Sequence, residues 1–173
     1  MTKRILSLLA LLVLPLAAQT LDTPVLPDPA NAIQVLPDQH ITLKYHFVAA
    51  GKQVYKCDNG AWSKTSEPHA TLYDKDSTPV VRHTGGPAWS MIDGSGTIRA
   101  VGALAVHFPS PDGVSIDWLR LDADKSSRTG AFSDVAIIQR LYTGLGKAPP
   151  TSCSAGQIYE SPYTAHYYFW SMK

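Results

Sequence analysis

The sequence predicts an all-β protein: a single-domain antiparallel β-sandwich or barrel with one disulfide. Charged residues make up 17% of the chain, against about 25% in a typical soluble domain. Trp, Tyr, Val, Ser and Thr, several of which favour strands, take their place. Short runs of β-branched and aromatic residues alternate with turn signals at the spacing seen in sandwiches and barrels.

The first eighteen residues have the layout of a secretory signal peptide. Lys3 and Arg4 precede the apolar run Ile5–Leu14, and small residues follow up to Ala18, where signal peptidase would cleave. The apolar run is too short for a bilayer core, which needs about 20 residues. We therefore expect cleavage near Ala18, a secreted or periplasmic protein, and no transmembrane segment after cleavage.

Residues 19–40 are expected to form an extended or disordered lead-in, because prolines recur among small and polar residues. Residues 41–173 then form a single β-rich domain, since the chain after the leader is long enough for only one. Without Lys3 and Arg4 the chain has 13 basic and 14 acidic residues, a net charge of −1 with His neutral. This balance argues against nucleic acid as a partner.

Ten runs are predicted as strands: Ile41–Val48, Gln53–Cys57, Ala61–Thr65, Ala70–Tyr73, Val80–Thr84, Ala88–Ile92, Thr97–Phe108, Asp117–Ala123, Val135–Thr143 and Thr164–Trp170. Turn signals such as Asp58-Asn59-Gly60 and Asp93-Gly94 separate them. Within Val135–Tyr142 the apolar residues also fit a short helix. Its β-branched and aromatic composition favours the strand.

The two cysteines of the mature chain, Cys57 and Cys153, are predicted to form a disulfide, because export places them where thiols oxidise. The closed loop would span most of the domain, and such a loop stabilises by about 4 to 5 kcal/mol in the chain-entropy account. Neither cysteine has neighbours at metal-ligand spacing, so a metal site is disfavoured. A reactive thiol is the weakest alternative.

Four residues are candidates for a binding surface. His83 and Trp89 flank the Gly85-Gly86-Pro87 turn, where two glycines permit close approach and the side chains supply a titratable donor and a stacking face. Asp93 could contribute a carboxylate, although Asp93-Gly94 favours a plain hairpin turn. His166 belongs to the last aromatic run. The six histidines show no metal-binding spacing, so no metal is expected.

In the last run, period-two alternation places Ala165, Tyr167 and Phe169 on one face, which should be core. Thr164, His166, Tyr168 and Trp170 fall on the other face. That second face could form an exposed aromatic platform for a sugar ring or a protein. Burial is favoured, because aromatic strands usually build cores.

Several blocks stand in a characteristic order: Gly51-Lys-Gln-Val-Tyr-Lys-Cys57, His83-Thr-Gly-Gly-Pro-Ala-Trp89 and Pro162-Tyr-Thr-Ala-His-Tyr-Tyr-Phe169. Through them the chain resembles the DUF3455 family, exported proteins of unassigned function. Ser90 and His166 stand where acidic residues are usual in that family. The resemblance implies secretion, one fold unit and the Cys57–Cys153 pairing, but no reaction.

We expect a non-catalytic binding or envelope-associated module whose partner is an extracellular glycan or protein. No Gly-x-Gly-x-x-Gly follows a strand, so no dinucleotide site is expected. We expect no cofactor. The first alternative is a secreted enzyme of unknown reaction, with a site near His83, Asp93 and His166. The second is a lysozyme-inhibitor-like protein, because Tyr55-Lys-Cys57-Asp-Asn-Gly60 is similar to the opening strand of such inhibitors.

Overall fold

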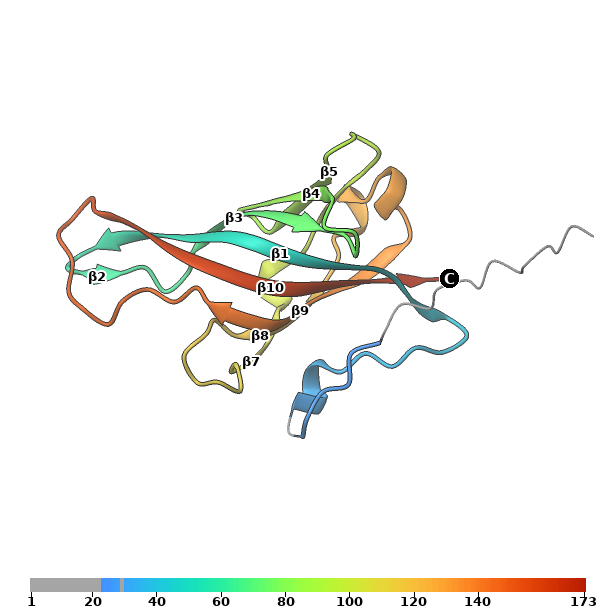
Figure 1. Cartoon of the computed structure of the whole chain (residues 1–173), viewed down its shortest axis with the longest axis horizontal. Helices are drawn as coiled ribbons and strands as arrows, with labels where there is room; N and C mark the ends of the chain where they lie inside the picture. The colour runs from blue at the N-terminus through green and yellow to red at the C-terminus, as the bar shows by residue number, and fades with distance from the viewer. Residues whose placement is uncertain (1–22, 29) are drawn as a thin grey trace, which may run out of the picture.

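The computed structural model describes residues 23–28 and 30–173 and confirms the all-β prediction. The predicted signal peptide, residues 1–18, lies outside the described residues. One antiparallel sheet has the order β6-β5-β4-β3-β1-β10-β9-β8-β7, and β2 pairs with the end of β1 (Figure 1). The strands are β1 (Ile41–Asp58), β2 (Ala61–Trp62), β3 (Glu67–Tyr73), β4 (Pro79–Thr84), β5 (Ala88–Met91), β6 (Thr97–Arg99), β7 (Val106–Phe108), β8 (Trp118–Asp122), β9 (Val135–Leu145) and β10 (Ile158–Met172). Short 3-10 helices are η1 (Ala30–Ile33), η2 (Gly102–Leu104), η3 (Lys125–Ser127) and η4 (Gly130–Phe132).

The centre of the sheet is the long antiparallel pair β1 and β10, whose register runs from Ile41 opposite Met172 to Lys56 opposite Ile158. The sequence predicted a break between Ile41–Val48 and Gln53–Cys57, and that prediction is wrong. Gly51 lies inside the strand, opposite Tyr163 on β10 and Ala70 on β3. A Cβ atom there would lie 2.5 Å from the Ala70 Cα atom, so this glycine permits a close approach between strands instead of a turn.

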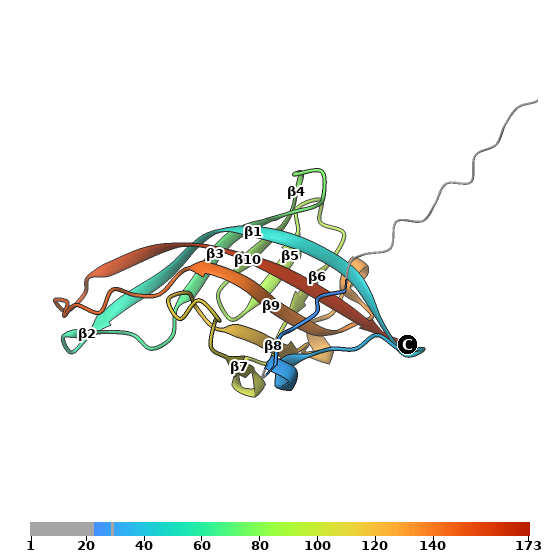
Figure 2. The same cartoon turned by 60° about the horizontal axis from the view of Figure 1, so that its bottom comes forward.

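The sheet curls into a half-barrel that closes at one end (Figure 2). Ala100, just after β6, forms an isolated bridge with Ala123, just after β8. The backbone N–H of Val101 donates to the Asp122 carbonyl, and that of Asp124 donates to the Arg99 carbonyl. The predicted single strand Thr97–Phe108 is therefore wrong, because the chain crosses here from β6 at one edge of the sheet to β7 at the other.

The two faces of the sheet carry separate apolar clusters, as the alternation along β10 predicted. Ala165, Tyr167 and Phe169 are buried inside the curl. Tyr168 and Trp170 are buried on the outer face. The expectation of burial is confirmed there, so these two rings do not form an exposed platform.

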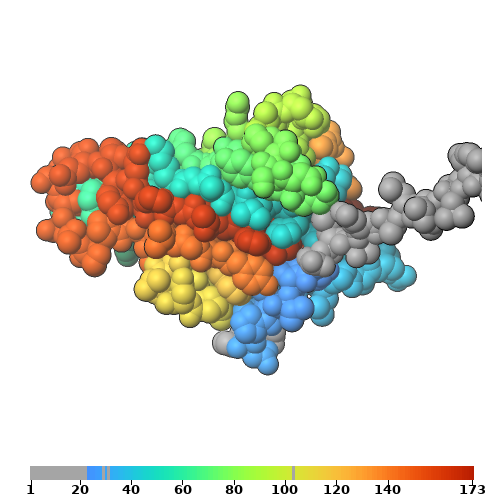
Figure 3. All heavy atoms as spheres, in the orientation of Figure 1, coloured from blue at the N-terminus to red at the C-terminus, as the bar shows by residue number. Residues whose placement is uncertain are grey.

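The lead-in covers that outer face. Leu26, Ala30, Ile33 and Val35 belong to the same buried cluster as Trp170, and Figure 3 shows this segment, in blue, beside the strands β9 and β10. The side-chain amide of Gln139 on β9 links the two layers. It donates to the Ile33 carbonyl and accepts a hydrogen bond from Trp170 Nε1.

The strand predicted over Val135–Thr143 forms as β9, extends to Leu145 and contains a β-bulge. Thr164 on β10 pairs with Gly144, whereas His166 pairs with Leu141, so two residues of β9 stand opposite one of β10. Tyr142 lies at this bulge with a φ of 49°, a backbone conformation that is unusual for a bulky residue. The bulge reverses the side on which its ring lies.

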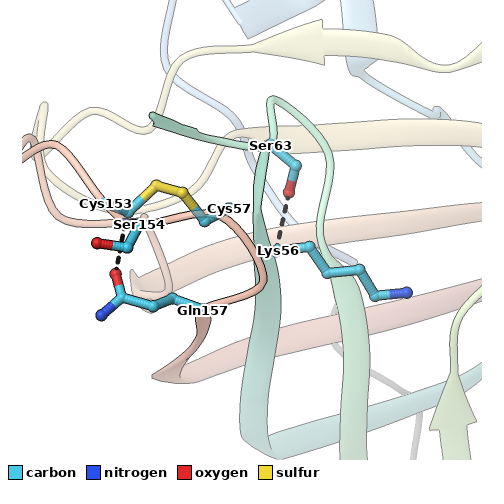
Figure 4. Close-up of a disulfide and its surroundings, with 6 residues drawn as sticks. All are labelled: Lys56, Cys57, Ser63, Cys153, Ser154 and Gln157. Carbon is cyan, nitrogen blue, oxygen red and sulfur yellow. Dashed lines mark hydrogen bonds between the residues drawn. A yellow bond between two sulfur atoms is a disulfide. The ribbon is translucent and has the colours of Figure 1, made fainter. Parts of the chain in front are cut away.

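Cys57 and Cys153 form the predicted disulfide, with Cα atoms 5.9 Å apart (Figure 4). The bond joins the end of β1 to the loop before β10. Two hydrogen bonds order its surroundings: Ser154 N–H donates to Gln157 Oε1, and Lys56 N–H donates to Ser63 Oγ. The disulfide fits an oxidising, extracellular environment.

No helix in the described part of the chain is long and apolar enough to cross a membrane.

We predict that Gly51→Ala destabilises the protein by about 1 to 3 kcal/mol, because the added methyl group overlaps backbone atoms of β3. The matched control is Gly85→Ala. A Cβ atom at Gly85 meets only the side chain of the exposed Glu67, so its effect should stay within about 0.5 kcal/mol. Urea unfolding of the oxidised proteins measures both. Equal stabilities for the two variants would contradict the close approach at Gly51.

Candidate functional site

The candidate site is a cavity of about 310 Å³ in the interior of the curled sheet. Its lining residues come from eight strands and the loops between them, and the exposed ones, Thr65, Gly86, Gly102 and His107, form the rim. The buried lining residues are Gln53, Pro68, His83, Trp89, Leu119, Leu121 and Tyr167. Pockets of this size, apolar with a few convergent polar groups, are the usual binding sites for small molecules.

Strand register assembles these walls from distant parts of the sequence. On one side, His83 of β4 lies opposite Trp89 of β5. On the other side, Tyr167 of β10 lies opposite Arg140 of β9, which in turn lies opposite Leu119 of β8. Residues directly opposite on one sheet face are close neighbours. The curl brings the two rows together, because the His83 and Tyr167 rings lie edge to face with centroids 5.2 Å apart.

The bulge in β9 keeps a further ring out of this interior. Period-two alternation from Arg140 would direct the side chain of Tyr142 to the inner face. Instead, the Tyr142 ring lies on the outer face, where it meets Trp118 and His166 edge-on. A non-glycine residue at positive φ is strained, and such strain is found preferentially at functional sites.

Two buried donors in the cavity wall have no hydrogen-bond partner in the described part of the chain: Gln53 Nε2 and Trp89 Nε1. Each residue is only 1% exposed. The other end of the Gln53 amide, Oε1, accepts a hydrogen bond of 2.6 Å from Ser66 Oγ. A buried polar group without a partner is unfavourable by about 1 to 3 kcal/mol, so a ligand with acceptor atoms would relieve a cost built into the folded protein.

His83 is a neutral, packed member of the wall. Its ring stacks on Trp89 with centroids 4.4 Å apart and planes at 1°. Burial lowers the pKa of His83 to about 3, and the charge of Arg140 acts in the same direction. The ring is therefore neutral near pH 7. Because Nδ1 lies 2.9 Å from the Ala88 carbonyl, the proton belongs on Nδ1, and Nε2 is left as an acceptor.

Arg140 is the one permanently charged residue among those lining the cavity in the described structure. Its Nε and Nη2 atoms donate to the Asp117 carbonyl at 3.1 and 2.8 Å, which fixes the plane of the guanidinium group. The carbonyl is neutral, so these bonds do not compensate the charge. Tyr167, its cross-strand partner, has its hydroxyl 3.5 Å from that of Tyr163.

The other two residues proposed from the sequence lie away from the cavity. Asp93 is in the exposed turn between β5 and β6, where its carboxylate accepts a 2.9 Å hydrogen bond from the Ser95 N–H. Hydrogen bonds from Ser95 lower the pKa of Asp93. His166 lies on the outer face, with Nδ1 3.0 Å from His46 Nε2. Thus His83 and Trp89 come together, whereas Asp93 and His166 do not join them.

Sequence reasoning missed three residues of this site: Gln53, Arg140 and Tyr167. Gln53 and Arg140 are polar residues on the inward-facing side of their strands, where most residues are apolar. A polar residue in such a position is the signal that could have found them. To use this signal, one must know which residues of each strand face inward. The incorrectly predicted break before Gln53 hid this for β1. Tyr167 was assigned to the core, and it is buried there.

The described residues contain no group of three His, Cys, Asp or Glu side chains placed to hold a metal ion. The residues that line the cavity supply N–H donors, one permanent positive charge, two imidazoles, hydroxyl groups and apolar walls. These groups can hold and orient a small molecule.

Comparison with known proteins assigns a family and no activity. No curated protein and no solved structure matches the chain. The family described as "Protein of unknown function (DUF3455)" matches residues 37–171, a span that includes every strand of the sheet except the last residue of β10. The chain therefore belongs to the DUF3455 family.

Proposed function

We propose that this protein is an exported, non-catalytic binding protein that holds a small molecule in the cavity of its curled sheet. The observation that carries the proposal is the pair of buried, unpartnered donors, Gln53 Nε2 and Trp89 Nε1, in the wall of a cavity of about 310 Å³. Native proteins leave few buried polar atoms unpaired. Four such atoms occur in the described part of the chain, and two of them, those of Gln53 and Trp89, belong to residues that line this one cavity. An occupant with acceptor atoms would give both of these donors a partner.

Export is part of the proposal. The start of the chain has the layout of a signal peptide, and the disulfide requires oxidising conditions to persist. The binding protein would therefore act in the periplasm or outside the cell. An envelope-associated role is compatible with this location.

An enzyme with His83 as general base is less well supported. A general base works best with a pKa near the operating pH, whereas burial lowers the pKa of His83 to about 3. Asp93 and His166 do not reach the same cavity. The dispersed positions of the three proposed residues favour binding over catalysis.

Filling the cavity should abolish binding without unfolding the protein. Ala105 lines the cavity near its rim, and Ala105→Phe would place a ring in it. Leu104→Phe is the matched control, because Leu104 is 61% exposed and does not line the cavity. We expect small molecules from a panel of benzoate, benzamide, benzyl alcohol and cyclohexanol to shift the Trp89 indole N–H resonance in the native protein and Leu104→Phe, but not in Ala105→Phe.

Two results of this titration would contradict the proposal. One is equal binding by Ala105→Phe and the native protein, which would place the ligand elsewhere. The other is the absence of any shift at the Trp89 indole with every compound, up to the millimolar range. Melting temperatures of both variants establish that they are folded.

The neutral, buried state of His83 predicts a pH dependence of stability. Its pKa is about 3 in the folded protein and about 6.5 when unfolded, so between these values the unfolded chain binds more protons. The free energy of unfolding should therefore fall as the pH drops from about 6.5 toward 3, by up to about 1.4 kcal/mol per pH unit from this residue. Urea unfolding should show a shallower decline for His83→Gln than for the native protein.

The control for this experiment is His40→Gln, which replaces an exposed histidine and should keep the native slope. Protonation of carboxylates also lowers the free energy of unfolding toward acid pH. The informative quantity is therefore the difference between the two proteins in the slope of that free energy against pH. An identical slope for His83→Gln and the native protein would mean that His83 takes up a proton while folded, which would reopen a catalytic role.

A further inference from the structure

The polar groups of the cavity select for one kind of ligand. Gln53 Nε2 and Trp89 Nε1 are donors without partners in the described residues, and Arg140 adds a positive charge. No Asp or Glu lines the cavity within the described structure. We infer that the ligand is a small carboxylate with a compact apolar body, an inference that rests on the proposed binding function.

The charge of Arg140 is the first step of the argument. Among residues 23–28 and 30–173, the ion pairs formed by side chains do not include Arg140. Its half-buried guanidinium group is held by a neutral carbonyl, that of Asp117. A carboxylate would therefore gain a charge-assisted hydrogen bond in a partly desolvated place, where such bonds are stronger than between neutral groups.

The remaining lining residues define the rest of the ligand. Leu119, Leu121 and Pro87 supply apolar surface, against which a hydrocarbon group can pack. A cavity of about 310 Å³ corresponds to roughly ten water molecules at about 30 Å³ each. A compact ring or short branched chain fits this volume better than a sugar chain or a fatty acid.

A single positive charge also favours a carboxylate over a phosphate ester. Phosphate groups carry close to two negative charges at neutral pH and are usually met by several cationic groups or by a helix N-terminus. Here one guanidinium group and two neutral donors belong to residues that line the same cavity, together with apolar residues. These groups match one negative charge shared by two oxygen atoms.

The test compares benzoate with benzamide, which has nearly the same shape but no charge, by isothermal titration at pH 7 with the native, oxidised protein. We expect benzoate to bind at least about tenfold more tightly than benzamide. Arg140→Gln should remove this preference. Arg120→Gln is the matched control, because Arg120 lies opposite the outer-face residue Gln139 and does not line the cavity; it should keep the preference.

Gln53→Glu provides a second variant in case Arg140→Gln does not fold. The substitution keeps the shape and the acceptor for Ser66 Oγ, while it replaces a donor by a negative charge. Both ligands lose the same donor, but only benzoate meets a like charge, so we expect benzoate binding to weaken at least about tenfold more than benzamide binding. Inorganic phosphate, titrated in parallel, should bind more weakly than benzoate.

The results separate this inference from the proposed function. If benzamide or cyclohexanol binds in the cavity as tightly as benzoate, the carboxylate assignment is wrong and the binding function stands. If phosphate binds more tightly than benzoate, the ligand class is also wrong. If none of the compounds binds, both the inference and the proposed function are overturned.

Discussion

The ladder between β1 and β10 is the constraint on which the rest of the structure depends. Its register extends from Ile41 opposite Met172 to Lys56 opposite Ile158, and it separates an inner from an outer apolar cluster. Gly51 lies within this ladder, where β1 passes so close to β3 that a side chain would overlap the backbone of Ala70. The same two strands carry Gln53 and Tyr167 into the interior and direct Trp170 to the face that the lead-in covers. The disulfide ties the far end of β1 to the loop that leads into β10.

The interior of the half-barrel is not a uniform apolar core. A protein selected for stability alone would pair or replace the buried donors of Gln53 and Trp89, because each unpaired donor lowers stability by an amount that is large against a total of about 5 to 15 kcal/mol. Here both lie with Arg140 around one cavity. On the outer face the Gln139 amide is buried with a partner at each end, whereas Trp118 Nε1 is buried there without a partner among the described residues. The inner cavity differs in that two unpaired donors and a positive charge belong to residues that line one space.

Much of this fold could be predicted from local patterns, because strand alternation and turn residues act over a few positions. These patterns anticipated β9, predicted over Val135–Thr143, and the two faces of β10. The signal-peptide layout and the family resemblance anticipated the Cys57–Cys153 bond. The ends of strands were harder to predict. Gly51 resembles a turn signal although it lies inside a strand, and the crossing near Ala100 depends on a bridge to the distant Ala123. Half of the proposed site was also misplaced. Asp93 and His166 are residues with functional chemistry, but only the register and curl of the sheet decide which side chains share a cavity, and these selected Gln53 and Arg140.

The most direct test of this account is a crystal structure of the oxidised protein soaked with benzoate. The account predicts that the benzoate carboxylate lies within hydrogen-bond distance of the Arg140 guanidinium group and of Gln53 Nε2 or Trp89 Nε1, with its ring against Leu119 and Leu121. Benzoate bound only at the surface would contradict the account. So would a cavity closed by protein groups that give both donors their partners, because no polar group would then be left for a ligand.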